Sequence, residues 1–205
     1  PLVRVNGERI IDSLIDAALA VDIEEIIIVR GYLGEQFEQL LYKYPMIKFL
    51  DNKEYLTANN ISSAICAKDL FSNAYVFEAD LLISNPKVLK KYHYSSNFLG
   101  IKVEQSDDWC FEVDKGIIQK QMIGGKNCYQ MVGISYWNDI DGRAISKDLT
   151  EAYSHTDGKE LYWEQVPLKI FRDNYEVEIS ECSNDDVVEI DTFEELQKID
   201  INYCV

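Results

Sequence analysis

The chain is short of basic residues and has no long apolar run. Its 205 residues carry 20 lysines and arginines against 36 aspartates and glutamates, a formal net charge of -16. Binding to nucleic acid depends on basic side chains that neutralise phosphates, so we expect no nucleic-acid partner. No apolar run is long enough to span a bilayer and no signal peptide is recognisable, so we expect no membrane association.

Cysteine and histidine are also scarce. The five cysteines are odd in number, widely spaced and free of any Cys-x-x-Cys pair. This pattern argues against a disulfide framework or a zinc site and favours the reducing cytoplasm. The only histidines, His93 and His155, do not follow predicted strand ends, so we interpret both as ordinary surface or core residues.

Apolar residues in the first half alternate between helical and strand spacing. Residues 8–21 and 34–44 have helical periodicity, residues 25–29 form a continuous apolar run, and residues 46–50 and 75–79 have the pattern of further strands. Such alternation is typical of βαβ units. With 47% hydrophobic residues, the chain predicts one α/β domain whose central sheet is mixed but mostly parallel, with helices on both faces.

The pattern changes after Pro86. Asp114-Lys115-Gly116 is a favourable hairpin turn between strands at 110–113 and 117–122, which predicts a small antiparallel lobe. The other expected elements are a short helix at 86–92, strands at 98–103, 131–136 and 175–180, helices at 143–154 and 160–171, and a final helix from 192.

Two short apolar strands end on carboxylates. The first reaches Glu78 and Asp80. The second ends on Glu189 and Asp191. Carboxylates at neighbouring strand ends can hold a hard divalent cation such as Mg2+, which points to phosphate chemistry. The alternative is that an aspartate after a strand only caps the next helix or begins a turn.

Polar residues at a predicted helix start form a second candidate site. Asn59, Asn60 and Ser62 are able to face a nucleotide base or ribose, and they are equally able to serve as plain helix caps. Trp109 follows Asp108 in a polar stretch, where a tryptophan is better explained as a binding surface than as core.

Five segments of the chain follow one another in a recognisable order and spacing: residues 27–37, residues 59–63, Glu78-Ala79-Asp80, Leu161-Tyr162-Trp163-Glu164 and Glu189-Ile190-Asp191. These segments resemble those of bacterial CTP:phosphocholine cytidylyltransferases, within the superfamily of sugar-phosphate nucleotidyltransferases. The chain departs from the family pattern where Glu78 replaces an aspartate and Ile61 replaces an aromatic residue.

The resemblance implies a nucleotide-diphospho-sugar transferase-like fold, with residues 1–205 forming a single nucleotidyltransferase domain. The family's glycine-rich signature loop, which binds the triphosphate, and its first strand are not found in the sequence, whose residues 1–11 resemble the segment that follows that loop. We therefore expect weak turnover from the chain as given.

The resemblance also implies a mechanism and a set of site residues. Mg2+ would be held by Asp80 and Asp191, the catalytic pair, together with Glu189. The partners would be CTP and phosphocholine, and the product CDP-choline; a homodimer is left open. The expected binding residues are Asn59, Asn60 and Ser62 for the nucleotide, and Trp109, Tyr162, Glu189 and Trp163 for choline.

Three alternatives accompany this interpretation. The acceptor could instead be 2-aminoethylphosphonate or a sugar 1-phosphate, for which hydrogen-bonding groups would matter more than an aromatic cage. The chain could also be a catalytically silent nucleotide-binding module that lacks the signature loop. For Trp163, packing between helix and sheet is the alternative to choline binding.

Overall fold

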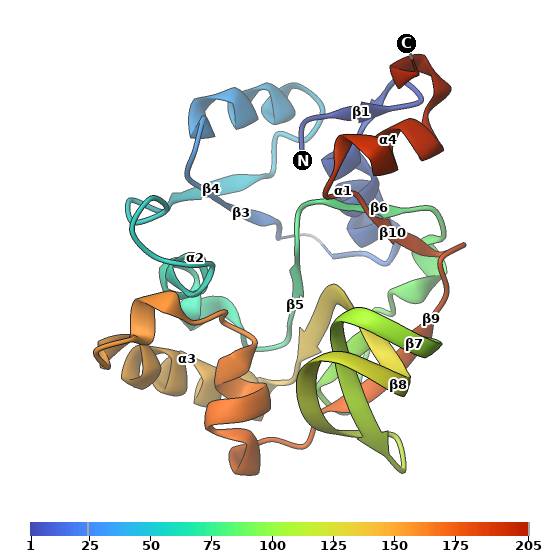
Figure 1. Cartoon of the computed structure of the whole chain (residues 1–205). Coiled ribbons are helices and arrows are strands. Elements are labelled where there is room, and N and C mark those ends of the chain that lie inside the picture. Colours follow the sequence, from blue (N-terminus) through green and yellow to red (C-terminus); the bar gives the residue numbers. More distant parts are fainter. Residues whose placement is uncertain (24, 205) are drawn as a thin grey trace.

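The main sheet occupies the lower half of the molecule in the computed structural model, which describes residues 1–23 and 25–204 (Figure 1). Its strand order is β5-β8-β7-β9, formed by Ala74–Phe77, Ile117–Trp137, Asn97–Asp114 and Glu178–Cys182. β8 runs antiparallel to β5 and β7, whereas β9 runs parallel to β7. This sheet carries part of the site described below.

Three smaller sheets complete the strand structure of the described residues. β3 (Ile27–Arg30) pairs in parallel with β4 (Lys48–Asp51), and β6 (Leu81–Ile83) pairs antiparallel with β10 (Val187–Glu189). The two-residue strands β1 (Arg4–Val5) and β2 (Glu8–Arg9) form a short antiparallel hairpin before the first helix.

The prediction of a mostly parallel sheet is therefore wrong in detail. Within the described residues, β3–β4 and β7–β9 are the parallel pairs, and the remaining pairs are antiparallel. A parallel pair needs a long crossover, whereas antiparallel strands can be joined by a tight turn. After β5 and β6 the chain enters the long β7–β8 hairpin, whose return strand pairs with β5, so this part of the sheet continues in antiparallel fashion.

The β7–β8 hairpin is longer and more curled than its sequence pattern predicts. The turn at Lys115 and Gly116 is confirmed: both residues have positive φ, 50° and 83°, as a tight primed turn requires. The predicted separate strands on either side merge into two continuous strands. Because Cys110 pairs with both Met122 and Gln130, the tip of the hairpin folds back on its own base.

Helix α1 (Ile10–Ala20) agrees with its prediction, and α3 (Asp139–Ser154) begins before the predicted start because Asn138 accepts a hydrogen bond from the Asp141 amide and caps it. Residues 160–171 do not form one helix. Pro167 has no amide hydrogen, which interrupts a helix interior, and the segment forms short turns at Gly158–Glu160 (η4) and Val166–Ile170 (η5).

The other helical segments are shorter or tighter than predicted. They are η1 (Gly34–Tyr42), α2 (Ile61–Cys66), η2 (Lys68–Leu70), η3 (Pro86–Val88), η6 (Arg172–Asn174), α4 (Phe193–Ile199) and η7 (Ile201–Tyr203). Among the described helices, none has the length and apolar character needed to cross a membrane.

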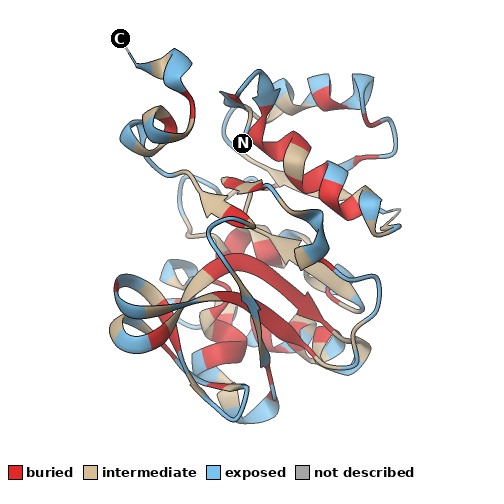
Figure 2. Ribbon diagram, turned by 90° about the vertical axis from the view of Figure 1, so that its right-hand side faces the viewer, coloured by how far each residue is buried: buried red, intermediate tan, exposed pale blue. Residues whose placement is uncertain are grey.

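The largest hydrophobic core lies between α3 and the main sheet. Trp137, Ile145 and Leu149 are fully buried there, and buried residues line the facing strands (Figure 2). A second core packs α1 against β6 and the opposite side of the sheet, through Leu14 and Leu81 among others. β5 contacts both cores, through Val76 on one side and Tyr75 and Phe77 on the other, and the chain between β5 and β6 carries Glu78 and Asp80.

Candidate active site

The two acidic motifs meet through strand pairing. The Glu78 amide donates to the Gly133 carbonyl (2.7 Å), which extends the β5–β8 pairing by one residue. The antiparallel β6–β10 pair places Glu189 opposite Leu81, and the Ile190 amide donates to the Asp80 carbonyl (3.1 Å). Segments far apart in the sequence thus bring their carboxylates to one place.

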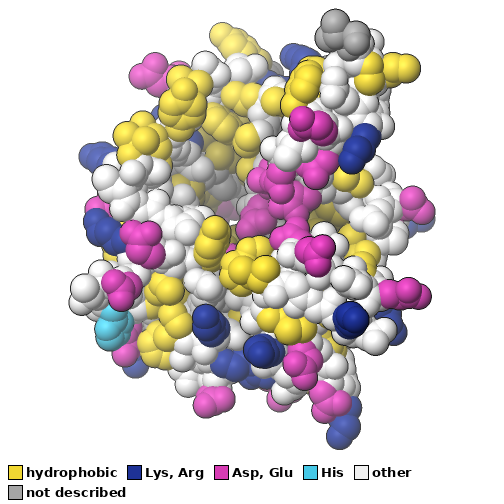
Figure 3. Space-filling view, viewed as in Figure 1, with side chains coloured by type: hydrophobic (Ala, Val, Ile, Leu, Met, Phe, Trp, Pro, Cys, Tyr) yellow, Lys and Arg dark blue, Asp and Glu magenta, His cyan; other side chains and the backbone are white. Residues whose placement is uncertain are grey.

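Three of these carboxylates converge closely. Glu78, Asp80 and Glu189 each offer an oxygen, and these oxygens lie within 4.8 Å of one another. Oδ1 of Asp80 is buried without a hydrogen-bond partner among the described residues. Figure 3 shows acidic side chains gathered near the centre of this face, beside a hollow in the surface. A hard all-oxygen donor set with an unsatisfied atom fits a Mg2+ ion.

Burial and mutual repulsion disturb the titration of this group. Desolvation, followed by the charge of Glu164, raises the pKa of Glu78 to about 8. Desolvation, followed by the charges of Asp191 and Asp80, raises the pKa of Glu189 to about 7. Within the described part of the chain, no Lys, Arg or His forms an ion pair with these carboxylates. A bound cation would relieve their repulsion.

Asp191 lies just outside the three-carboxylate group. Its residue is exposed, and its amide donates to the Glu195 carboxylate (2.9 Å) at the start of α4, where Thr192 and Glu195 form a capping box. Burial and the neighbouring charge of Asp80 raise the pKa of its carboxyl. The structure thus brings Asp80 and Glu189 together as predicted, places Asp191 at the edge, and adds Glu78, which the sequence pattern did not assign to the metal.

The predicted aromatic pair is formed. The rings of Trp109, from β7, and Tyr162, which follows η4, lie 5.6 Å apart between centroids in an edge-on arrangement. Tyr162 keeps 39% of its surface exposed. Asp108 accepts a hydrogen bond from the Trp109 amide (2.6 Å), and its charge contributes to the raised pKa of Glu189, so the aromatic pair and the carboxylates belong to one region.

Trp163 lies elsewhere. Only 6% of its surface is exposed, and its ring packs against Phe71, Phe98 and Trp137 in the largest core. This is the core position that the sequence left open as the alternative. Its role is to fix the segment that carries Tyr162 and Glu164.

The predicted nucleotide-binding residues are largely engaged with the protein itself. Asn60 accepts a hydrogen bond from the Trp163 amide (2.8 Å) and donates to the Glu164 carboxylate (3.4 Å). The Asn59 side chain is also engaged, because it accepts a hydrogen bond from the Asn60 amide (2.7 Å). The Ser62 hydroxyl donates to the Asn59 carbonyl (2.8 Å). These residues tie the start of α2 to residues 159–164.

Two features of the site were missed by the sequence pattern. The side chain of Glu164 is buried, with 2% of the residue exposed, although glutamates are rarely buried unless they are paired. Gly133, inside β8, leaves the space that the Glu78 side chain fills, since a Cβ there would lie 2.2 Å from Glu78 Oε2. A glycine within a strand often marks such a close approach, and this was the available signal.

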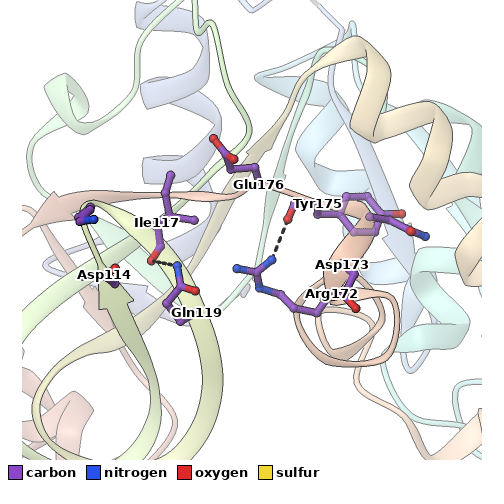
Figure 4. A pocket seen from close by; sticks show the side chains of 9 residues that line it. Asp114, Ile117, Gln119, Arg172, Asp173, Tyr175 and Glu176 are labelled. Carbon is purple, nitrogen blue, oxygen red and sulfur yellow. Dashed lines mark hydrogen bonds between the residues drawn. The ribbon is translucent and has the colours of Figure 1, made fainter.

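A separate hollow of about 530 Å³ lies between the β7–β8 turn and Arg172–Asn174 (Figure 4). The Arg172 guanidinium there donates to the carbonyls of Tyr175 (2.9 Å) and Ile118 (2.7 Å). Because its donors serve the backbone, this arginine holds η6 against the hairpin, and the acidic region remains the candidate active site.

Comparison with known proteins identifies the chemistry. A scan against protein-family models finds no match. A 2-aminoethylphosphonate cytidylyltransferase of Lancefieldella rimae is 33% identical over 207 residues, which cover 99% of this chain and 84% of that protein. The chain belongs to the cytidylyltransferases. A choline-phosphate cytidylyltransferase of Haemophilus influenzae is 29% identical over 97% of this chain and 85% of its own length.

The fold of the cytidylyltransferase is that of its relatives. The solved CTP:phosphocholine cytidylyltransferase of Streptococcus pneumoniae superimposes with a TM-score of 0.90 at 25% identity, covering 98% of this chain and 88% of that one. The predicted α/β nucleotidyltransferase fold and enzyme class are thereby confirmed. The enzyme is a CTP-dependent cytidylyltransferase, and the alternative of a silent binding module is set aside.

Proposed function

We propose that this enzyme transfers CMP from CTP to 2-aminoethylphosphonate and releases pyrophosphate. The observation that carries the proposal is the convergence of Glu78, Asp80 and Glu189 beside the Trp109–Tyr162 pair, with no basic ion-pair partner among the described residues. Carboxylate oxygens that the metal leaves free can accept hydrogen bonds from an acceptor that ends in a primary ammonium group. The 33% identity to a 2-aminoethylphosphonate cytidylyltransferase supports the same choice.

Phosphocholine, the acceptor first predicted from the sequence, becomes the second candidate. The edge-on Trp109–Tyr162 pair favours it, because aromatic faces bind quaternary ammonium groups by cation–π attraction, about 0.5 to 2 kcal/mol for each contact. The relatives that act on choline phosphate are somewhat less similar, at 29% identity for the Haemophilus influenzae enzyme.

Asp80 and Glu189, with Asp191 and Glu78 beside them, would hold Mg2+. When bound, such an ion neutralises charge that develops on the phosphoryl group in transfer. Oδ1 of Asp80 would be one of the ligand oxygens, because no hydrogen-bond donor among the described residues competes for it.

The reaction requires no protein nucleophile. An oxygen of the acceptor's phosphonate attacks the α-phosphorus of CTP, the bond to the β-phosphate oxygen breaks, and pyrophosphate leaves. The attacking oxygen already carries negative charge near neutral pH, so no base has to remove a proton, and positioning supplies most of the rate. His93 has no part in this reaction. Its ring nitrogens contact the Asn97 amide (3.0 Å from Asn97 Nδ2 to His93 Nδ1) and the Tyr75 hydroxyl.

Pyrophosphate release by the full-length protein tests the proposal. Each of the four nucleoside triphosphates would be combined with 2-aminoethylphosphonate, phosphocholine and a panel of sugar 1-phosphates, in the presence of Mg2+. We expect the highest kcat/KM for CTP with 2-aminoethylphosphonate. A higher value for CTP with phosphocholine would make the second candidate the function, and release only with sugar 1-phosphates would refute both.

A further inference from the structure

Asp191 is exposed at the edge of the acidic group, so its side chain is placed mainly by the backbone from which it projects. On the side toward β10, that backbone is fixed by the bond from the Ile190 amide to the Asp80 carbonyl (3.1 Å). On the other side, the chain turns directly into α4 (Figure 1). The contacts of this turn therefore decide where the Asp191 carboxylate lies.

Glu195 holds the turn in a way that goes beyond helix capping. In a capping box, the glutamate at the third helical position bonds the amide of the N-cap residue, which here is Thr192. Oε2 of Glu195 accepts this bond (2.9 Å), and the same oxygen also accepts a bond from the Asp191 amide (2.9 Å). The second bond is no part of a capping box. It fixes the peptide group that leads into Asp191.

The helix that it caps holds Glu195 in its turn. The Glu195 amide donates to the Thr192 hydroxyl (3.2 Å), which completes the capping box. The next residue, Leu196, is buried in one apolar cluster with Val5 and Ile10. Glu195 thus connects the packed face of α4 to the backbone of Asp191.

We propose that Glu195 is a positioning residue for Asp191, whose carboxylate it keeps available to Mg2+ beside Asp80 and Glu189. This inference rests on the proposed function, in which Asp191 takes part in holding the ion. Glu195 acts through the Asp191 amide and does not itself touch the metal. Outer groups that orient a ligand change metal affinity in this indirect way.

Four variants separate positioning from capping and from charge. Glu195→Ala removes the hydrogen-bond acceptor, the cap and the charge together. Glu195→Gln removes the charge but keeps a carbonyl oxygen that can accept from both amides. Thr192→Ala removes the other half of the capping box and leaves the bond between Glu195 and the Asp191 amide possible. Glu194→Ala is the matched control, because it removes an exposed charge from the same helical turn.

Binding of Mn2+ to the full-length enzyme without substrates gives a readout that does not depend on turnover. Mn2+ takes the same carboxylate ligands as Mg2+, and its free form is followed by EPR. Glu195→Ala should raise the Kd for Mn2+ about 3- to 10-fold, less than for a buried charged hydrogen bond because Glu195 is partly exposed. Glu195→Gln, Thr192→Ala and Glu194→Ala should stay within about twofold of wild type.

Turnover with CTP and 2-aminoethylphosphonate should show the same effect on the Mg2+ requirement. Glu195→Ala should need about 3 to 10 times more Mg2+ for half-maximal rate, with kcat at saturating Mg2+ close to that of wild type. Loss of the helix cap should lower the melting temperature of both Thr192→Ala and Glu195→Ala, whereas the Mg2+ requirement should rise in Glu195→Ala alone. Circular dichroism melting measures the first effect and establishes that every variant is folded.

The Asp191→Asn background gives the decisive comparison, because a positioning residue acts only through the group that it positions. In this background, adding Glu195→Ala should leave the Kd for Mn2+ unchanged. An equal loss with and without the Asp191 carboxylate would overturn the proposal. Equal losses in Glu195→Gln and Glu195→Ala would show that only the charge matters, and equal losses in Thr192→Ala and Glu195→Ala that only the cap matters; either result also overturns it.

The proposed function and the positioning role fail in different ways. Wild-type enzyme that releases no pyrophosphate from CTP with any acceptor refutes the proposed function. Normal wild-type turnover together with a wild-type Kd for Mn2+ in folded Glu195→Ala leaves the function standing and shows the positioning role to be wrong.

Discussion

The largest hydrophobic core and the acidic site differ in the kind of side chain they bury. Around Trp137, Ile145 and Leu149, apolar side chains are fully buried against one another. Around Glu78 and Glu189, carboxylates are partly or mostly buried beside like charges, which raises the pKa of each. The core therefore stabilises the fold, whereas repulsion between the carboxylates destabilises it. A bound cation and a cationic acceptor can relieve that repulsion.

The largest expected effect is the loss of activity on removing one carboxylate from the acidic site. Asp80→Asn should lower kcat/KM by about 1000-fold or more, since a metal-holding carboxylate supports several kcal/mol of transition-state stabilisation. Its melting temperature should stay the same or rise, because one repelling charge is removed. Steady-state kinetics and thermal unfolding in parallel measure both quantities, and wild-type turnover would remove Asp80 from the site.

A substitution in the core should have the opposite profile. Leu149 is fully buried on α3, so Leu149→Ala should lower the free energy of unfolding by about 2 to 5 kcal/mol. The protein that remains folded should keep its acceptor preference. Denaturant unfolding measures the loss, and a loss below 1 kcal/mol would show that this core is looser than its burial indicates.

Stability should also depend on pH and on Mg2+ in a linked way. The folded-state pKa of Glu78, about 8, and that of Glu189, about 7, exceed the ordinary 4.5, so the folded protein binds more protons than the unfolded chain over this interval. The stability these groups contribute is present below about pH 4.5 and is lost as pH rises through 7 to 8. Other groups add their own pH dependence, so the comparison is made against Asp80→Asn.

At pH 8, adding Mg2+ at about 100 times its dissociation constant should therefore raise the free energy of unfolding by about 2.7 kcal/mol. The gain should be larger at pH 8 than at pH 5.5 and should vanish in Asp80→Asn. Thermal unfolding with and without EDTA gives the answer, and equal Mg2+ stabilisation of wild type and Asp80→Asn would place the ion elsewhere.

The smallest effect concerns the aromatic pair. Trp109→Ala should raise the acceptor KM by about 2- to 30-fold, the range of one lost cation–π contact, and leave the KM for CTP nearly unchanged. Equal increases for both substrates would indicate that Trp109 supports the fold and not the acceptor.

Local signals in the sequence were sufficient for some elements. The turn at Lys115 and Gly116 and helix α1 follow from short-range chemistry, and both were predicted. The direction of the main sheet was not, because it depends on β8 returning to pair with β5, a contact between residues far apart in the chain. Pairing partners of this kind leave no periodic trace in the sequence.

The site divides in the same way. Asp80, Glu189 and the Trp109–Tyr162 pair were predicted from strand ends and from resemblance to a family, and the structure brings each group together. Glu164 was not recognised as buried, because its burial depends on the core that surrounds Trp163. The sequence could not decide whether Asn60 caps the helix or faces a nucleotide, because the hydrogen-bond partners of its side chain lie about a hundred residues away in the chain.

The most direct test of the central claim is the ratio of kcat/KM for 2-aminoethylphosphonate over phosphocholine, measured with CTP and Mg2+ on the full-length wild-type enzyme. A site built on carboxylates for a primary ammonium predicts a ratio well above one, about 10 or more if one charged hydrogen bond separates the acceptors. A ratio below one would contradict that account and return the aromatic pair to the leading role.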